Sequence, residues 1–201
     1  MQRFDNFLPE SHLKEIHRVF LGNDFPWYYA PYTSKPQTGI YGAGTVFTSN
    51  VIENPQFVHT FYYGADQKTS ALYDLVSPFV VLLQKESKQN LILKRIKANM
   101  VLRHADYPDG CYNTPHVDWN PDDRVDGKYK SFLYYVTESD GDTFIFNEYI
   151  QDNPKDLTVK QRITPKSNSG VLFDSDNYHA SSPPVNSNIR VVINFVFMEG
   201  Q

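Results

Sequence analysis

The chain has 201 residues, 40% hydrophobic and 21% charged, which suits one soluble globular domain with a substantial core. The formal net charge of −4 makes nucleic acid the least favoured partner, although a short basic run occurs at Lys94, Arg95 and Lys97. The lone Cys111 excludes internal disulfides, and neither a signal peptide nor an apolar run of roughly twenty residues is present, so we expect a cytoplasmic protein without a membrane segment.

Residues 1–90 are expected to form helices and loops that support a later β region. Apolar residues recur at helical spacing over 9–20, and Gly22 ends this helix. Aromatic residues, Pro and Gly dominate 25–48, which predicts loops and a candidate strand over 45–47. Residues 57–63 are expected to form another strand.

A second helical section is expected over 69–87, in two pieces. Ser77 and Pro78 fit a helix N-cap followed by proline at the first helical position, which divides the section. Helices of this kind suit packing against the outside of a sheet.

The periodicity changes from helical to two at Leu91. Ile96, Ala98 and Met100 fall on one face of a long predicted strand, and Arg95, Lys97 and Asn99 fall on the other. Further strands are expected over 114–119, 131–136, 143–146, 157–163, 170–173 and 190–197. Short strands at this spacing predict a mainly β fold with flanking helices, a jelly roll (double-stranded β-helix) over 91–198 within a single domain, 1–201.

A histidine and a carboxylate stand two residues apart at His116 and Asp118. In an extended segment both side chains point to the same face, and together they are two thirds of the 2-His-1-carboxylate set that holds non-haem Fe(II). His104 and Asp106 show the same spacing, and either pair could instead be a surface histidine near a solvated carboxylate.

The missing third ligand is expected to be His179, which follows a turn at the start of a predicted strand. Arg190 opens the last strand and points to its less apolar side, away from Val191, Ile193 and Phe195. A guanidinium beside a metal is a bidentate receptor for a carboxylate, and the alternative is an arginine paired with a surface aspartate.

This set of residues resembles the Fe(II)/2-oxoglutarate-dependent dioxygenases, in particular the prolyl-4-hydroxylase-like branch. Tyr107, followed by a turn glycine, matches a tyrosine that helps to bind 2-oxoglutarate in that branch, and Pro115 also matches. The segment 140–144 is similar to the family's Gly-Gly-x-Thr-x-Phe motif, with Asp140 in place of the first glycine. Arg190 stands where that branch usually has lysine, one residue further from the distal histidine.

The resemblance implies an Fe(II) site formed by His116, Asp118 and His179, with 2-oxoglutarate and O2 as cosubstrates and ascorbate as an accessory reductant. It implies that Arg190 and Tyr107 hold the far carboxylate of 2-oxoglutarate. The expected reaction hydroxylates a peptidyl or small-molecule substrate and releases succinate and CO2. The resemblance also favours His116 and Asp118 over His104 and Asp106 as the ligand pair.

Two other functions remain open from the sequence. The same jelly roll could serve a binding or structural protein without catalysis, or a cupin-type metal dioxygenase that does not use 2-oxoglutarate. A cation such as Arg190 that could bind a cosubstrate carboxylate favours the oxygenase, because a cupin-type dioxygenase that does not use 2-oxoglutarate has no need of it. The specificity-determining loops are expected over 27–41 and 119–127, and the oligomeric state is not readable.

Overall fold

The computed structural model describes residues 1–34, 49–64, 67–118, 127–152 and 154–200. In chain order the elements are β1 (Gln2–Asp5), α1 (Glu10–Phe20), β2 (Tyr28–Ala30), β3 (Gln56–Tyr63), α2 (Tyr73–Val76), α3 (Pro78–Ser87), β4 (Leu91–Leu102), β5 (Tyr129–Tyr135), β6 (Thr143–Tyr149), a 3-10 helix (Ile150–Asp152), β7 (Val159–Ile163), β8 (Ser169–Asp174), β9 (Asn177–Ser181) and β10 (Ile189–Glu199).

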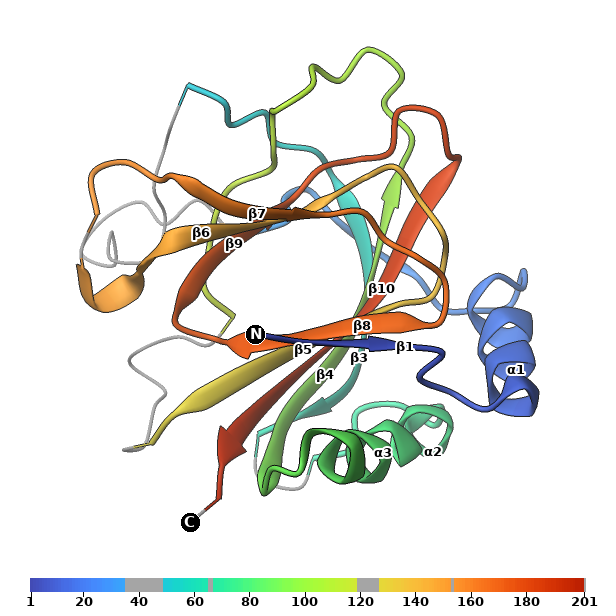
Figure 1. Cartoon of the computed structure of the whole chain (residues 1–201). Helices are drawn as coiled ribbons and strands as arrows, with labels where there is room; N and C mark the ends of the chain where they lie inside the picture. The colour runs from blue at the N-terminus through green and yellow to red at the C-terminus, as the bar shows by residue number, and fades with distance from the viewer. Residues whose placement is uncertain (35–48, 65–66, 119–126, 153, 201) are drawn as a thin grey trace.

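Two antiparallel sheets face each other (Figure 1). The large sheet has seven strands in the order β1-β8-β5-β10-β4-β3-β2, and the small sheet has three in the order β7-β6-β9. The long strands β4 and β10 pair along nearly their whole length at the centre of the large sheet. This arrangement confirms the expected mainly β jelly roll.

The helices cover the outer face of the large sheet (Figure 1). Phe79 and Leu83 of α3 and Ile16 of α1 are fully buried in one apolar cluster with sheet residues such as Ile96 and Phe195. Strand β10 contributes alternate residues to this cluster, as its period of two predicts. The expectation of helices packed on the outside of the sheet is therefore confirmed.

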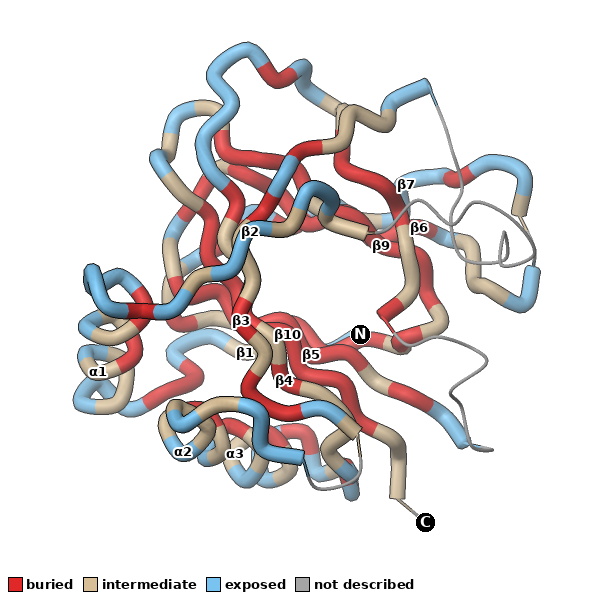
Figure 2. Tube along the Cα trace, turned by 180° about the vertical axis from the view of Figure 1, so that it is seen from behind, coloured by how far each residue is buried: buried red, intermediate tan, exposed pale blue. Residues whose placement is uncertain are grey.

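The opposite face of β10 points into the space between the sheets. Val192 packs there with Tyr135, Ile145 and Phe173, and Arg190 and Asn194 lie on the same face and are almost fully buried. Figure 2 shows long buried stretches along β5 and β10, and the central residues of β8 are buried as well. A polar residue on this inner face must find its partners inside the protein.

The N-terminal residues do more than support the jelly roll. Strand β1 pairs with β8, and β3 pairs with β4, so both belong to the large sheet. The strands β1 and β2 were not predicted, because four- and three-residue strands carry too little periodicity to be recognised.

Two local predictions are wrong. Residues 114–119 do not form a named strand as far as the described residues go, to Asp118; His116 instead makes an isolated bridge. Ser77 divides the helical section as predicted, but it has helical φ and ψ and no side-chain capping bond. The candidate strand over 45–47 lies outside the described residues.

Within the described part of the chain, no helix is both long enough and apolar enough to cross a membrane.

Candidate metal centre

The backbone of His116 is paired with that of His179. The His116 amide donates to the His179 carbonyl at 2.9 Å, and the His179 amide donates to the His116 carbonyl at 3.0 Å. This antiparallel bridge attaches the segment after β4 to β9 and brings the two imidazole rings to a centroid separation of 4.6 Å. A single pair of backbone hydrogen bonds therefore joins two histidines that are far apart in the sequence.

Backbone carbonyls fix how the two imidazoles point. Nδ1 of His116 lies 3.0 Å from the Thr114 carbonyl, and Nδ1 of His179 lies 3.2 Å from the Asn177 carbonyl. Because a carbonyl can only accept, each Nδ1 carries the hydrogen, which leaves each Nε2 with a free lone pair. This is the tautomer that a metal ligand needs.

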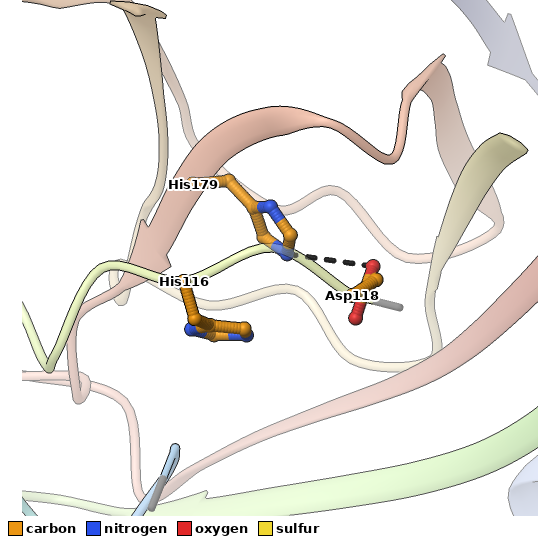
Figure 3. Close-up of side chains that lie close together, drawn as sticks. All are labelled: His116, Asp118 and His179. Atoms are coloured by element: carbon orange, nitrogen blue, oxygen red, sulfur yellow. Dashed lines mark ion pairs between the residues drawn. The ribbon is translucent and has the colours of Figure 1, made fainter. Parts of the chain in front are cut away.

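Asp118 completes the group (Figure 3). One ligand atom from each of His116, Asp118 and His179 lies within 4.8 Å of the other two, and Nε2 of His179 is 3.4 Å from Oδ2 of Asp118. No other group of three metal-ligating side chains occurs in the described ranges. The structure brings together the three residues that the sequence indicated.

The Asp118 carboxylate is held by two neighbours on the large sheet. Arg95 donates from Nη2 to Oδ1 at 2.8 Å and from Nη1 to the Asp118 carbonyl at 2.9 Å. The amide of Asn194 donates to both carboxylate oxygens, at 3.0 and 2.9 Å. These bonds fix the carboxylate in one orientation toward the two imidazoles.

The electrostatics of the centre favour the metal-binding protonation states. Burial lowers the pKa of His116 to about 3, and the neighbouring His179 adds to this shift. Burial alone would raise the pKa of Asp118, but His179 in its protonated form, together with the cationic Arg95, outweighs burial and holds the pKa of this carboxyl well below its usual range. At neutral pH His116 is therefore neutral and Asp118 is ionised.

Arg190 is a buried cation at the start of β10. Its Nε donates to the Gly141 carbonyl at 2.8 Å, and its Nη2 donates to Oγ1 of Thr143 at 2.7 Å. The hydroxyl of Tyr135 also donates to this Thr143 oxygen, at 3.0 Å. Among the described residues no carboxylate forms an ion pair with Arg190, so the alternative of an arginine paired with a surface aspartate is not what the structure shows.

Tyr107 is buried, but the structure gives its hydroxyl a different partner from the one expected. The phenol donates to the Ile52 carbonyl at 2.7 Å, and its ring packs against His104. Burial raises the pKa of Tyr107, so it is a neutral donor at neutral pH. None of the contacts described for Tyr107 reaches Arg190.

The remaining histidines have structural partners. His104, of the second His-x-Asp pair, is exposed and contacts Asn54 through Nδ1 at 2.8 Å. Nε2 of His12 lies 2.9 Å from the Leu75 carbonyl, and Nε2 of His17 lies 2.9 Å from the Val136 carbonyl. His59 is bound between Pro26 and Ser70.

A cavity of about 310 Å³ opens beside His116 and Asp118. We call it the triad cavity; its wall includes Thr33, Gln56, Arg95, Lys97, His116 and Asp118. Two buried polar atoms on the inner face of β4, Nε of Arg95 and Oδ1 of Asn99, have no hydrogen-bond partner in the described structure. Buried atoms of this kind call for a ligand or solvent partner.

Sequence reasoning missed Arg95, Asn194, Lys97 and Tyr135 as site residues. The signal for the first three was present, because the period of two places Arg95 and Lys97 on the polar face of β4 and Asn194 beside Arg190 on β10. Tyr135 lies in a near-continuous apolar run, which gives no sign of the face it occupies.

The sequence profile of the 2OG-Fe(II) oxygenase superfamily matches residues 101–198. This range contains His116, Asp118, His179, Tyr107 and Arg190. Residues 101–198 are a 2OG-Fe(II) oxygenase domain. The expectation of a 2-oxoglutarate/Fe(II)-dependent dioxygenase is confirmed at this level, and membership implies Fe(II) and 2-oxoglutarate.

Several solved structures of 2-oxoglutarate-dependent enzymes have the same fold as this chain. The non-heme alpha ketoglutarate dependent epimerase SnoN from nogalamycin biosynthesis matches with a TM-score of 0.58 and 10% identity, over 98% of this chain and 77% of that one. A 2OG-Fe(II) oxygenase family oxidoreductase from Burkholderia pseudomallei matches with a TM-score of 0.55 and 12% identity, over 94% and 78%. At these identities the likeness concerns the fold alone. Among curated proteins, none matches this sequence.

Proposed function

We propose that this oxygenase binds Fe(II) through His116, Asp118 and His179 and couples the decarboxylation of 2-oxoglutarate, with release of succinate and CO2, to the hydroxylation of a peptidyl or small-molecule substrate. The observation that carries the proposal is the convergence of three ligand atoms within 4.8 Å from segments far apart in the chain. Two imidazoles and one carboxylate are the donor set of non-haem Fe(II) oxygenases, which leave open positions for cosubstrate and O2.

The donor set fits this metal. Both Nε2 lone pairs are free, and the ionised Asp118 supplies the single negative charge that balances part of a divalent cation. Bound Fe(II) would supply the activation of O2, and 2-oxoglutarate would supply the electrons. The protein's part is to orient the three ligands and to keep bulk water from the reacting atoms.

Arg190 is the proposed anchor for the far carboxylate of 2-oxoglutarate. Its guanidinium is buried and makes its two described hydrogen bonds to neutral oxygens, so no described carboxylate is bonded to it, and Asp142 acts on it only at longer range. The Thr143 hydroxyl accepts from both Arg190 and Tyr135, so its own hydrogen is left for the cosubstrate carboxylate. Such an anchor favours this reaction over a cupin-type dioxygenase that does not use 2-oxoglutarate, and over a non-catalytic jelly roll.

Tyr107 remains part of the proposed cosubstrate site. A phenol has one hydrogen, and that of Tyr107 is donated to the Ile52 carbonyl. Binding of a carboxylate by Tyr107 would therefore require the hydroxyl to exchange the Ile52 carbonyl for the cosubstrate.

We also propose that the whole chain works as one domain. Strands from residues 1–90 belong to the same sheet as β10, and the triad cavity is lined by Thr33 and Gln56 as well as by His116 and Asp118. The use of ascorbate and a cytoplasmic location remain expectations from the sequence. The predicted specificity loops over 27–41 and 119–127 are described only at 27–34 and 127.

The test is Fe(II)-dependent conversion of 2-oxoglutarate to succinate by the purified chain. We expect turnover in the wild type and none in His116→Ala, Asp118→Ala or His179→Ala, which should also lose Fe(II) binding. His104→Ala is the matched control, since His104 has the same spacing to an aspartate but is exposed and away from the three ligands. Arg190→Ala should chiefly raise the KM for 2-oxoglutarate. Full turnover in all three ligand variants would end the proposal.

A further inference from the structure

Lys97 is a cation in the wall of the triad cavity without a bonded partner. Its side chain lines the same cavity as His116 and Asp118. It lies on β4 opposite Asn194 of β10 and opposite Thr60 of β3, in the middle of the large sheet. In the described part of the chain its ammonium group has no hydrogen bond and no ion pair.

The nearby carboxylates are occupied by other groups. Among the described residues that line the cavity, Asp118 is the one carboxylate, and it already accepts from Arg95 and Asn194. Glu53, which lies behind Thr33, accepts from the backbone amides of Thr33 and Thr114. Lys97 therefore adds a positive charge that no described carboxylate pairs with directly, although Asp118 attracts it at longer range.

Burial of Lys97 lowers its pKa to about 8, with Arg95 acting in the same direction and Asp118 acting against it. At neutral pH most of the population is still protonated. Holding a cation in a cavity without a partner is unfavourable, and an anionic ligand would relieve this cost.

The position of Lys97 separates it from the proposed 2-oxoglutarate anchor. Arg190 is opposite Val101 on β4, whereas Lys97 is opposite Asn194. Four residues along a strand correspond to about 13 Å. The two cations therefore lie at different points along the inner face of the sheet, and Asp118 is bound by Asn194 at the Lys97 end.

We propose that Lys97 recognises the oxygenase's substrate by binding an anionic group, a carboxylate or a phosphate, inside the triad cavity. This proposal rests on the proposed function, because it takes the cavity beside His116 and Asp118 to be the place where substrate binds. The cavity of about 310 Å³ suits a small molecule or a single amino-acid side chain with its carboxylate. Within both substrate classes left open above, peptidyl and small-molecule, the proposal selects an anionic substrate.

The polar wall of the cavity is consistent with this chemistry. Gln56 is fixed in place because its amide donates to the carbonyls of Tyr32 and Thr33, both at 3.0 Å. Arg95 lies beside Lys97 on the same face and has an unpartnered buried Nε. An anion held by Lys97 would thus lie next to a second cationic side chain and close to the metal ligands.

The experiment compares probes that differ in charge. N-acetyl-L-tyrosine and its neutral amide form one pair, and phenyl phosphate and phenol form the other. Their dissociation constants are measured by proton NMR on the metal-free protein and on protein saturated with Mn(II) and 2-oxoglutarate, where paramagnetic broadening also reports how close the probe lies to the metal. The variants are Lys97→Met, Lys97→Arg and, as control, Lys94→Met on the same strand, whose side chain lines a cavity beside the helices.

We expect the wild type and Lys94→Met to bind at least one anionic probe about tenfold more tightly than the neutral compound of the same pair. Mn(II) should broaden the NMR signals of this anionic probe. Lys97→Met should reduce this preference to within about twofold, and Lys97→Arg should retain it. The pair that shows the preference identifies carboxylate or phosphate as the recognised group. A preference that is absent in the wild type, or unchanged in Lys97→Met, overturns the proposal.

The two proposals fail in different ways. If the wild type does not bind Mn(II), the proposed function fails. The effect of Lys97 on the preference for anionic over neutral probes is then measured on the metal-free protein. If Mn(II) and 2-oxoglutarate bind but the preference does not depend on Lys97, the metal centre stands and Lys97 has no part in recognition.

Discussion

At the scale of single residues, the centre depends on side chains that hold the ligands rather than on the ligands alone. Asp118 receives hydrogen bonds from Arg95 and Asn194, and each histidine is oriented by a backbone carbonyl two residues before it. Partners of this kind fix tautomer and direction, and their loss commonly weakens metal binding strongly.

Asn194→Ala should therefore weaken metal binding without removing any proposed ligand. The change deletes both amide donations to Asp118 and leaves the carboxylate to Arg95 alone. We expect the Kd for Mn(II), measured by calorimetry, to rise about 10- to 100-fold. Asn188→Ala is the control, because Asn188 is exposed just before β10. An unchanged Kd, with the fold intact by circular dichroism, would remove Asn194 from the site.

The lowered pKa of His116 gives the metal-free protein a specific pH dependence. Burial lowers its pKa to about 3 in the folded state, whereas an unfolded histidine titrates near 6.5. The unfolded chain thus binds the additional proton between these values, so folding stability is full above about pH 6.5 and decreases as the pH falls toward 3.

Urea unfolding at pH 7 and pH 5, with metal removed by a chelator, tests this dependence. The loss of unfolding free energy between the two pH values should be smaller in His116→Gln than in the wild type. Asp118 does not interfere, because its unfolded carboxyl titrates near 3.9, below this window. An equal loss in both proteins would show that His116 is not held neutral by burial.

At the scale of elements, the site depends on loops that the long strands position. The β5–β6 turn is fastened to the segment before β10 by Asp140, whose carboxylate accepts from the backbone amides of Asn186 and Ser187 at 2.8 and 2.9 Å. These backbone bonds outweigh burial and hold the pKa of Asp140 below its usual range. The same turn supplies the Gly141 carbonyl that binds Arg190.

Asp140→Ala should lower the free energy of unfolding by about 1–3 kcal/mol, because several backbone donors lose their acceptor. It should also raise the KM for 2-oxoglutarate, since Arg190 depends on this turn. Glu138→Ala, at an exposed neighbouring position, should change neither quantity appreciably. Equal stability of the two variants by urea unfolding would contradict the role assigned to Asp140.

At the scale of the whole molecule, the sequence predicted those features of the fold and of the metal centre that follow from hydrophobic periodicity and from residue spacing. The alternation in β4 and β10 predicted the two faces of the central strands, and the pattern around His116, together with His179, indicated the three side chains that the structure brings together. The role of Arg190 stays a prediction. The short strands β1 and β2, the isolated bridge at His116 and the hydroxyl partner of Tyr107 were not predictable. They depend on contacts with distant parts of the chain, which local patterns do not record.

The most direct measurement is anomalous X-ray diffraction from a crystal of the protein grown with Mn(II) and 2-oxoglutarate. We predict one strong anomalous peak per chain within bonding distance of Nε2 of His116, Nε2 of His179 and the Asp118 carboxylate, with cosubstrate density running from that peak to Arg190. A peak bound by any other set of side chains, or no peak at saturating Mn(II), would contradict the account.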